Sequence, residues 1–357
     1  SLCTRRFTGA KFGRRCGRLK PDVSPEVSVV MAAYNDAAYL VQAMDSLLGQ
    51  RFRDFEVIVF DDASTDATWE ILSRYAQQDG RVRAIQNAAN MGLTASLNQG
   101  FALAQGKYIA RMDADDVSLT HRLGTQVAYM NAHPTVAACG SWVKTIGNPS
   151  GHVWRHPTQA DEVRYSLLFR SVLVHPTVVI RRSVMEQLGM AYNPAYVYAQ
   201  DYALWAELAQ QFPLVNLPQV LLQYRCHARQ RGQAHQADQQ AVADQVRRQQ
   251  LAHLEIAFTA SEFECHRQVG THSVPATVAS VEAAEAWLLR LSRYCQDRDP
   301  AATEAIRRVF GREWFGVCDR TASLGRWVWY RFRASPLSQG AEIPLINRLK
   351  FALKCLR

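Results

Sequence analysis

Residues 55–66 have the sequence FEVIVFDDASTD, and residues 107–116 have the sequence KYIARMDADD. In both stretches a short apolar run ends in a cluster of acidic side chains. The apolar runs, 55–60 and 107–110, have the length and composition of buried strands. Because a carboxylate is costly to bury, acidic residues gathered where strands end predict a rim that meets a cation or hydrogen-bond donors.

Strands and helical periods alternate four times around these two stretches. The predicted strands cover residues 27–31, 55–60, 82–85 and 107–111, and apolar residues at helical spacing follow each of the first three. This alternation predicts a parallel sheet with right-handed crossovers and helices on both faces. Ligands of such sheets bind beyond the carboxyl ends of the strands, so Tyr34 and the two acidic clusters should converge on one edge.

The remainder of the chain is less regular. We expect helices over 121–130 and 201–211, strands over 136–143, 174–181, 214–217 and 220–224, and a loop over 147–156. From residue 233 Gln, Arg and Ala dominate, and helical periods follow near 281–291 and 303–310. The sequence therefore predicts a flexible basic lead-in over 1–26, an α/β domain over 27–230 and a helical, basic C-terminal region over 231–357.

Composition and charge narrow the classes of function. With 48% hydrophobic and 20% charged residues, the 357-residue chain has the composition of an ordinary globular protein. The net charge of +9 is unevenly placed, with basic residues gathered near both ends. Basic ends predict an attraction to phosphate, either on nucleic acid or on an anionic membrane surface. A solvated tail is the alternative for residues 1–20.

Aromatic and aliphatic side chains alternate with the positive charges near the C-terminal end. They are Trp327, Trp329, Tyr330, Phe332, Leu345, Ile346, Leu349, Phe351 and Leu356. This mixture favours an amphipathic segment at a membrane interface, and packing of the same residues against the main domain is the alternative.

The chain carries the sequence features of a cytoplasmic protein. It has no run of about 18 uninterrupted apolar residues, so we expect no membrane-spanning helix. The basic N-terminal residues have no apolar stretch behind them and do not resemble a secretory signal. Eight cysteines without a CxxC pair fit a reducing cytosol better than a disulfide framework or a zinc site. We therefore expect a cytoplasmic location, on the inner face of the membrane.

The triplet Asp113-Ala114-Asp115 is the first candidate for chemistry. Hard oxygen ligands on a short bend suit Mg²⁺ or Mn²⁺ beside a diphosphate, and capping of the following helix is the alternative use. On the same predicted edge, Asp62 can accept a hydrogen bond from an N–H of a base, while Tyr34 offers a face for stacking. The alternative for Tyr34 is packing against the sheet edge.

The series of motifs resembles that of inverting, family 2 glycosyltransferases with the GT-A fold. The similar segments are 27–35, 61–66, 90–100, 111–116, 174–177, 200–205 and 224–227. They span residues 27–227 in the family's order, which is more specific than any single motif. The resemblance implies a Rossmann-like, mostly parallel sheet with a nucleotide-binding half over 27–116 and an acceptor half over 117–230. It implies nothing for the C-terminal region.

The resemblance also implies roles for individual residues. Asp62 would hold the nucleotide base, beside Tyr34 and the backbone of Ala33. Asp113 would face the ribose or diphosphate, and Asp115 would bind Mn²⁺ or Mg²⁺. The implied donor site also includes Asn90, Arg111 and Arg225, and His227 is counted with the metal ligands near the diphosphate.

Asp201 is implied as the general base, because it occupies the acidic position before the Tyr-x-Leu-Trp motif. A helix N-cap is the alternative for this residue. Gln200 stands where the family usually has glutamate; its amide cannot accept a proton at neutral pH but can hydrogen-bond the acceptor. His175 is either a core histidine or an acceptor contact.

We therefore expect transfer of a sugar, with inversion, from a nucleotide diphosphate sugar, UDP-sugar favoured, to a hydroxyl of a lipid-linked or surface-glycan acceptor. One alternative is a sugar nucleotidyltransferase, which would need a Gly-rich basic loop where residues 31–35 are MAAYN. Another is a catalytically weak partner protein that binds nucleotide sugar, which Gln200 leaves open. Nucleic-acid binding explains the charge but not the acidic edge, so we expect no nucleic-acid partner.

Overall fold

The computed structural model describes residues 24–189, 191–227 and 236–356. Its first half has the predicted parallel sheet. Strands β1 (Val27–Ala33), β2 (Phe55–Asp61), β3 (Val82–Gln86) and β4 (Tyr108–Arg111) pair in the order β3-β2-β1-β4, all parallel. Ala33 pairs with Asp61, and Val30 pairs with Arg111. The carboxyl ends of these strands therefore share one edge.

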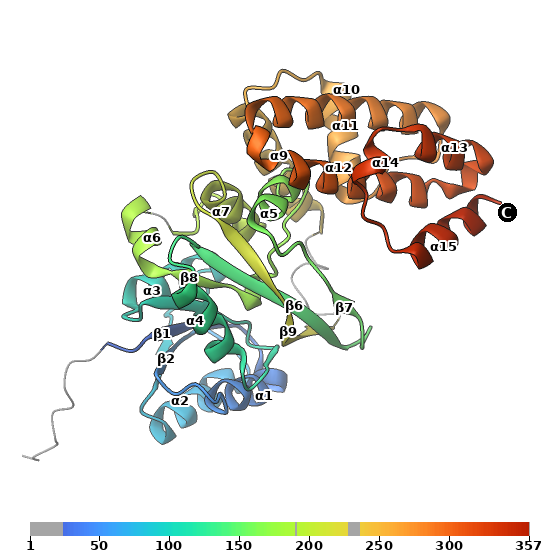
Figure 1. Ribbon diagram of the computed structural model, residues 1–357. Helices are drawn as coiled ribbons and strands as arrows, with labels where there is room; N and C mark the ends of the chain where they lie inside the picture. Colours follow the sequence, from blue (N-terminus) through green and yellow to red (C-terminus); the bar gives the residue numbers. More distant parts are fainter. Residues whose placement is uncertain (1–23, 190, 228–235, 357) are drawn as a thin grey trace, which may run out of the picture.

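The strands β1 and β2 are mostly apolar because helices cover both faces of the sheet (Figure 1). On one face α1 (Ala37–Leu48) and α2 (Thr68–Gln78) share a core with Val29 and Met31. On the other face α3 (Leu93–Leu103) shares a core with Val30 and Phe60. Alternate residues of β1 therefore enter opposite cores, as the period of a strand requires.

The second half of the sheet is mixed. β8 (Val179–Arg181) joins β4 antiparallel, β6 (Ala138–Gly147) joins β8 antiparallel, and β9 (Leu214–Cys226) joins β6 in parallel. The short strands β5 (Val117–Ser118) and β7 (Val153–Trp154) pair antiparallel with β9 and β6. The α/β fold class is confirmed, and the pairing of β5 with β9 brings the end of β9 beside the loop after β4.

Four predicted elements of this half need correction. The strand expected over 174–181 begins only at Val179, because His175–Thr177 form a 3-10 turn (η1) around a proline. The strands expected over 214–217 and 220–224 are the single strand β9, in which Pro218 falls at a register shift, where a bulge tolerates proline. The loop expected over 147–156 contains β7.

The helices of this half were predicted only where they are long. The expected helices over 121–130 and 201–211 are α4 (Arg122–Ala132) and α7 (Gln200–Leu208). The sequence did not predict α5 (Ala160–Ser166) and α6 (Arg182–Leu188), because seven residues leave too few apolar positions to define a helical period.

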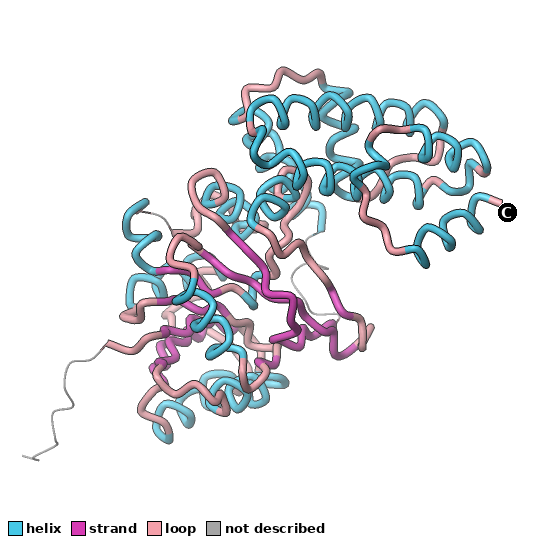
Figure 2. Tube along the Cα trace, in the orientation of Figure 1, coloured by secondary structure: helices cyan, strands magenta, loops and turns pink. Residues whose placement is uncertain are grey.

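The C-terminal region consists of helices and loops in its described part, as predicted (Figure 2). Its elements are α9 (Gln236–His253), α10 (Ala260–Thr271), α11 (Val278–Arg298), η2 (Pro300–Ala302), α12 (Thr303–Arg320), η3 (Ala322–Leu324), α13 (Arg326–Ala334), α14 (Leu337–Gly340) and α15 (Leu345–Cys355). The predicted boundary near residue 230 and most of the lead-in over 1–26 lie outside the described residues.

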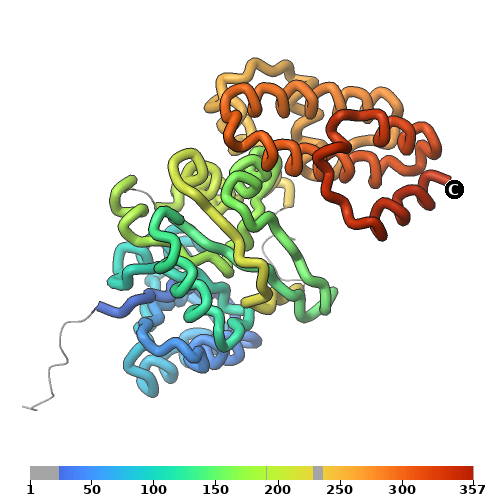
Figure 3. The backbone as a smooth tube through the Cα atoms, viewed as in Figure 1, coloured from blue at the N-terminus to red at the C-terminus, as the bar shows by residue number. Residues whose placement is uncertain are grey.

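This helical region is docked on the α/β part rather than simply attached to its end. Tyr165 of α5 and Phe169 after it belong to the same hydrophobic core as Trp314 of α12, and Figure 3 shows the green segment of α5 against the orange helices. Arg170 forms an ion pair with Glu313 at 2.5 Å across this boundary. Shared apolar burial and paired charges therefore fix the two parts together.

The aromatic residues near the C-terminus are mostly internal. Trp329 and Phe332 contact the ring of Phe351 at centroid distances of 5.5 and 5.4 Å, inside the helical core. These residues are therefore packed rather than interfacial, but they pack within the helical region and not against the main domain as the alternative expected. Within the described residues, none of the helices combines the length and the apolar character that crossing a bilayer requires.

Candidate active site

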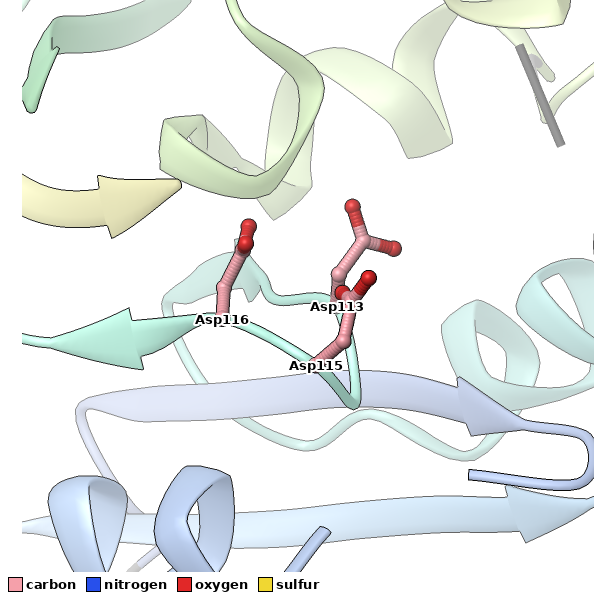
Figure 4. A group of neighbouring side chains, drawn as sticks. All are labelled: Asp113, Asp115 and Asp116. Carbon is pink, nitrogen blue, oxygen red and sulfur yellow. The ribbon is translucent and has the colours of Figure 1, made fainter. Parts of the chain in front are cut away.

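Three carboxylates gather in the short loop between β4 and β5. Asp113, Asp115 and Asp116 each place one oxygen within 4.8 Å of the others, and all three side chains point to the same side of the loop (Figure 4). Burial raises the pKa of Asp115, and raises that of Asp116 well above its ordinary value, with the Asp113 charge adding to both shifts. A carboxylate cluster with raised pKa values is a site that a cation would stabilise.

The cluster fits a divalent cation by its chemistry as well as by its charge. All of its ligand atoms are carboxylate oxygens, which suit Mg²⁺ or Mn²⁺. Among the described residues, no hydrogen-bond donor reaches Asp116 Oδ2, although this oxygen is buried. A buried oxygen of this kind is expected where an ion completes the site. The sequence singled out Asp113 and Asp115 and gave Asp116 no role.

The end of β9 holds this acidic loop in place. The amide N–H of Arg225 donates to Asp116 Oδ1 at 2.8 Å, and Arg225 Nε donates to the carbonyl oxygen of Asp115 at 2.7 Å. His227 Nε2 lies 2.9 Å from Asp115 Oδ2. Tyr39 of α1 lies beneath both, with its ring 4.6 Å from the Arg225 guanidinium carbon and 5.0 Å from the His227 ring. The sequence predicted that Arg225 and His227 lie near Asp115 but not that Tyr39 supports them.

Arg111 is buried beneath the cluster and forms an ion pair with Asp113. Its backbone carbonyl accepts a hydrogen bond of 2.7 Å from the buried Arg122. Burial lowers the pKa of Arg122 to about 10, and the Asp116 charge opposes that shift. The resemblance implied that Arg111 belongs to the donor site. In its described contacts Arg111 orients the side chain of Asp113.

Asp62 is buried and makes different contacts from those expected for a base-binding residue. Asp62 Oδ1 accepts from Asn87 Nδ2 at 2.8 Å and from the Met91 amide at 2.9 Å. Asp62 Oδ2 accepts from the Gly92 amide at 2.8 Å, and the Asn90 side chain accepts from the same amide at 3.2 Å. Asp62 therefore anchors the loop that carries Asn90. Its predicted contact with a base stays a prediction.

The loops after β1 and β2 are interlocked at the same edge. The Asp62 amide donates to the carbonyl of Ala33 at 2.9 Å, and the Thr65 amide donates to Asn35 Oδ1 at 2.8 Å. Asn35 and Ala63 both have left-handed backbones, with φ of 56° and 59°. A non-glycine residue there costs about 1–2 kcal/mol, so the hydrogen bonds between the loops hold a strained conformation. Beside them Tyr34 is 39% exposed, which does not fit a packed residue and leaves its ring open to stack.

Asp201 lies in the first turn of α7, and Gln200 is the buried first residue of that helix. The N-cap position belongs to Ala199, so Asp201 is not the N-cap residue proposed as its alternative role. Burial raises the pKa of Asp201, and the Tyr202 amide and the Arg111 charge do not cancel that effect. The charges of Arg111 and Asp113 both act on this carboxyl, so Asp201 lies within electrostatic range of the acidic loop.

His175 is a partly buried histidine beside this site. Its Nε2 lies 2.7 Å from the hydroxyl of Tyr192, and the two rings meet edge to face at 5.3 Å. Burial holds the pKa of His175 well below its usual value, and the Arg111 charge lowers it further, so the ring is neutral at pH 7. Asn98 fixes Tyr192 through two hydrogen bonds to its backbone. Tyr192 was missed because it lies in an irregular segment, where only the abundance of tyrosines over 192–202 marks it.

The comparisons with known proteins agree with this geometry. The sequence model described as "Glycosyl transferase family 2" matches residues 28–189. An uncharacterized glycosyltransferase of Haemophilus influenzae is 30% identical over 239 residues, which cover 64% of this chain and 74% of that protein. The chain belongs to glycosyl transferase family 2.

Other relatives of this family 2 glycosyltransferase have more specific names. The Escherichia coli protein "UDP-Glc:alpha-D-GlcNAc-diphosphoundecaprenol beta-1,3-glucosyltransferase WfaP" is 28% identical over 204 residues, covering 57% of this chain and 78% of that protein. Among solved structures, TarS 1-349 of S. aureus in complex with UDP-GlcNAc has a TM-score of 0.57, at 18% identity, covering 89% of this chain and 93% of that one. This likeness confirms the GT-A type of fold.

Proposed function

We propose that this glycosyltransferase moves a sugar from a UDP-sugar to a hydroxyl of a diphosphate-linked lipid acceptor, with inversion. The observation that carries the proposal is the meeting of the acidic loop with the end of β9. The charges of Arg111 and Asp113 also act on Asp201 at the start of α7, which supports a place for Asp201 in the same site. The fold neighbour TarS binds UDP-GlcNAc and the Escherichia coli relative is named for a UDP-sugar and a lipid-linked acceptor, which supports this choice of substrates.

The donor diphosphate would lie against the acidic loop, where Asp115, Asp113 and Asp116 would hold Mn²⁺ or Mg²⁺. A bound divalent cation supplies charge neutralisation for the departing diphosphate. His227, which contacts Asp115 at 2.9 Å, would orient that carboxylate or bind the metal directly. Arg225 would complete the positive side of the diphosphate site.

The uridine would lie at the edge formed by β1 and β2. The exposed ring of Tyr34 offers the stacking face, and the backbone of Ala33 lies beside it. Asn90 is carried on the loop that Asp62 anchors, so Asp62 would act on the nucleotide either directly or by positioning this loop. Residues 27–116 would form the nucleotide half and residues 117–230 the acceptor half.

Asp201 would accept the proton of the acceptor hydroxyl as the oxygen attacks the anomeric carbon of the donor. A raised pKa suits this task, because proton transfer is most effective when the base has a pKa near the working pH. Because the acceptor oxygen would displace UDP directly in one step, the anomeric configuration would be inverted. Gln200 would hydrogen-bond the acceptor. His175 would act on the site indirectly, through its contact with the hydroxyl of Tyr192.

The proposal is tested by incubating the full chain with Mn²⁺, a panel of UDP-sugars and GDP-mannose, with and without GlcNAc-diphosphoundecaprenol. We expect one UDP-sugar to be consumed, and NMR of the product to show an inverted anomeric centre. Asp201→Asn should abolish turnover while the UDP-sugar still raises the melting temperature. If no UDP-sugar of the panel raises the melting temperature or is consumed, the proposed donor is wrong.

A second candidate, a nucleotide-sugar-binding partner without turnover, is favoured by one observation. The amide of Gln200 occupies the start of α7, where the resemblance leads us to expect a carboxylate. This candidate predicts stabilisation by a UDP-sugar without any Mn²⁺-dependent release of UDP. The Asp201→Asn variant would then behave as the unmodified chain does in every assay.

A further inference from the structure

Helix α15 has two opposite apolar faces, and only one of them is buried. Phe351 and Cys355 are buried against the helical core. The other face consists of Leu345, Ile346, Leu349 and Leu353, with Leu356 at the C-terminal cap, and these five side chains are 53% to 72% exposed. At about 100° per residue they fill one arc of about 100°, roughly opposite Phe351 and Cys355. We call these five residues the leucine face.

The leucine face is unusual for the described surface. Twelve large apolar side chains are exposed in the described part of the chain, and five of them belong to this face. Of the other seven, Tyr330 lies on the neighbouring helix α13, and the remaining six are scattered over residues 34–278. Single exposed apolar residues need no explanation, but a contiguous stripe of five on one helix marks an interaction surface.

The charges around the leucine face indicate what it contacts. Helix α15 contains Arg348, Lys350 and Lys354 and no acidic residue. The neighbouring helix α13, which touches α15 through Trp329 and Phe351, exposes Arg326 and Arg333. The nearby acids are already paired, Asp319 with Lys354 at 2.7 Å and Glu342 with Arg308 at 3.1 Å. The stripe is therefore apolar in the middle and positive at its borders.

We propose that the leucine face docks on an anionic lipid bilayer, with α15 lying flat in the interface. Leucine side chains would enter the boundary between headgroups and acyl chains, and Lys350 and its basic neighbours would contact lipid phosphates. A second copy of the chain is a poorer occupant, because pairing two such faces would bring their positive borders together. In Figure 1 α15 lies at the outer edge of the helical region, where a planar surface can approach it.

This docking is independent of the proposed reaction, since it uses none of the residues of the acidic site. Its consequence would be to hold the enzyme at the surface where a lipid-linked acceptor lies. Binding to lipid and turnover can therefore be measured and lost separately.

The test is flotation of the full chain with vesicles of phosphatidylcholine, with or without phosphatidylglycerol. We expect binding to the vesicles that contain phosphatidylglycerol, weakened by salt. The double variant Leu349→Gln/Leu353→Gln should bind at least about tenfold more weakly, because two buried leucines are lost from the interface. Lys350→Gln should weaken binding less, and only to the anionic vesicles.

The matched control is Val278→Gln, which removes an exposed apolar side chain of α11 in the same helical region and should bind as the unmodified chain does. All substituted positions are exposed, so we expect the variants to fold, and circular dichroism would check this. The proposal is overturned if the unmodified chain does not bind anionic vesicles, or if the double variant binds equally well. It is also overturned if the chain is a dimer that the double variant converts to a monomer without any binding to lipid.

Discussion

At the scale of single residues, the candidate site consists of carboxylates in positions where burial and neighbouring negative charge disfavour ionisation. Asp116 is buried, accepts one hydrogen bond from Arg225, and shares its loop with two further carboxylates. Asp201 is a fourth carboxyl, on a different element, and burial raises its pKa. Since mutual repulsion and burial both destabilise ionised groups, we propose that these residues serve a bound ligand rather than the stability of the fold.

The first prediction concerns the stability of the metal-free protein. The folded-state pKa of Asp116 lies above its unfolded value, so the folded state binds more protons between the two values. Stability from this group is therefore gained as the pH falls through the raised pKa, and lost as the pH rises. Asp116→Asn should raise the free energy of unfolding at pH 8 by at least about 1 kcal/mol. Urea unfolding at pH 8 and pH 5 measures the difference, which should shrink at the lower pH.

Addition of Mn²⁺ supplies the control for this prediction. Mn²⁺ should stabilise the unmodified chain at pH 8 and have little effect on Asp116→Asn. A variant that is less stable than the unmodified chain at pH 8 without metal would contradict the assignment of Asp116 as a destabilising carboxylate.

The second prediction concerns the pH dependence of turnover. Because the pKa of Asp201 is raised, kcat/KM should decline as the pH falls through that raised value, where the carboxyl becomes protonated and cannot accept a proton. Asp201→Asn should lower kcat by about 10²–10⁴-fold above the raised pKa, lower it less at more acidic pH, and so remove this acidic limb. Initial rates across a pH series measure both, and an acidic limb that survives in Asp201→Asn would assign it to another group.

At the scale of elements, the position of the site depends on a close approach between two backbone segments and on the pairing of two strands. Gly106 ends the connection from α3 to β4, and a Cβ there would lie 2.5 Å from the backbone nitrogen of Ser28 in β1. This contact sets how β4 enters the sheet, and therefore where the acidic loop after it begins. The antiparallel pairing of β5 with β9 then carries Arg225 to that loop.

The third prediction follows from this contact. Gly106→Ala should lower the free energy of unfolding by about 1–3 kcal/mol, because the added methyl group meets backbone atoms that cannot move aside. Gly80→Ala is the matched control, since a Cβ at Gly80 would have no atom within 4 Å. Thermal unfolding of the two variants measures the difference. Equal melting temperatures would mean that β1 shifts to accept the methyl group.

The strands and helices of residues 27–111 could be predicted from the sequence because each one is long enough to show its period. The elements that were missed or misjudged depend on their partners. The 3-10 turn at His175–Thr177 interrupts an apolar run, and β9 passes Pro218 only because β6 accommodates a bulge opposite it. No local pattern contains that information.

The candidate site could be predicted in part for the same reason. Topology alone predicted that the acidic clusters share one edge of the sheet. The resemblance, rather than topology, implied that Asp115 and His227 both lie near the diphosphate, and these two side chains are in contact at 2.9 Å. The contacts of Asp62 depend on the loop over 87–92, and the position of Tyr192 depends on Asn98 in α3. Such contacts come from side chains that meet only in three dimensions.

At the scale of the whole molecule, the helical region and the α/β part form a single folded unit. The Arg170 guanidinium pairs with Glu313, which is almost fully buried, and donates to the carbonyls of Gly270 and Val269. These bonds join the segment after α5 to α10 and α12. The proposed lipid-binding helix α15 belongs to the same helical core through Phe351. We therefore propose that the acidic site and α15 keep a fixed relation to each other.

The fourth prediction tests this connection. Arg170→Ala should lower the free energy of unfolding by about 2–3 kcal/mol, because it leaves the Glu313 carboxylate buried without its partner. Arg298→Ala, which removes an exposed ion pair with Glu255, should have a small effect. Chemical unfolding measures both variants. Adding Glu313→Gln to Arg170→Ala should restore part of the loss, and no restoration would contradict an electrostatic cause.

Whether the acidic loop binds the donor diphosphate through a metal is tested most directly by calorimetric titration of UDP into the full chain, with Mn²⁺ and with EDTA. We predict binding that requires Mn²⁺, is weakened at least about tenfold in Asp115→Asn, and is unchanged in Asp201→Asn. These results would assign the acidic loop to the diphosphate and Asp201 to the acceptor. Binding of UDP that is equally strong in EDTA and in Asp115→Asn would contradict the account.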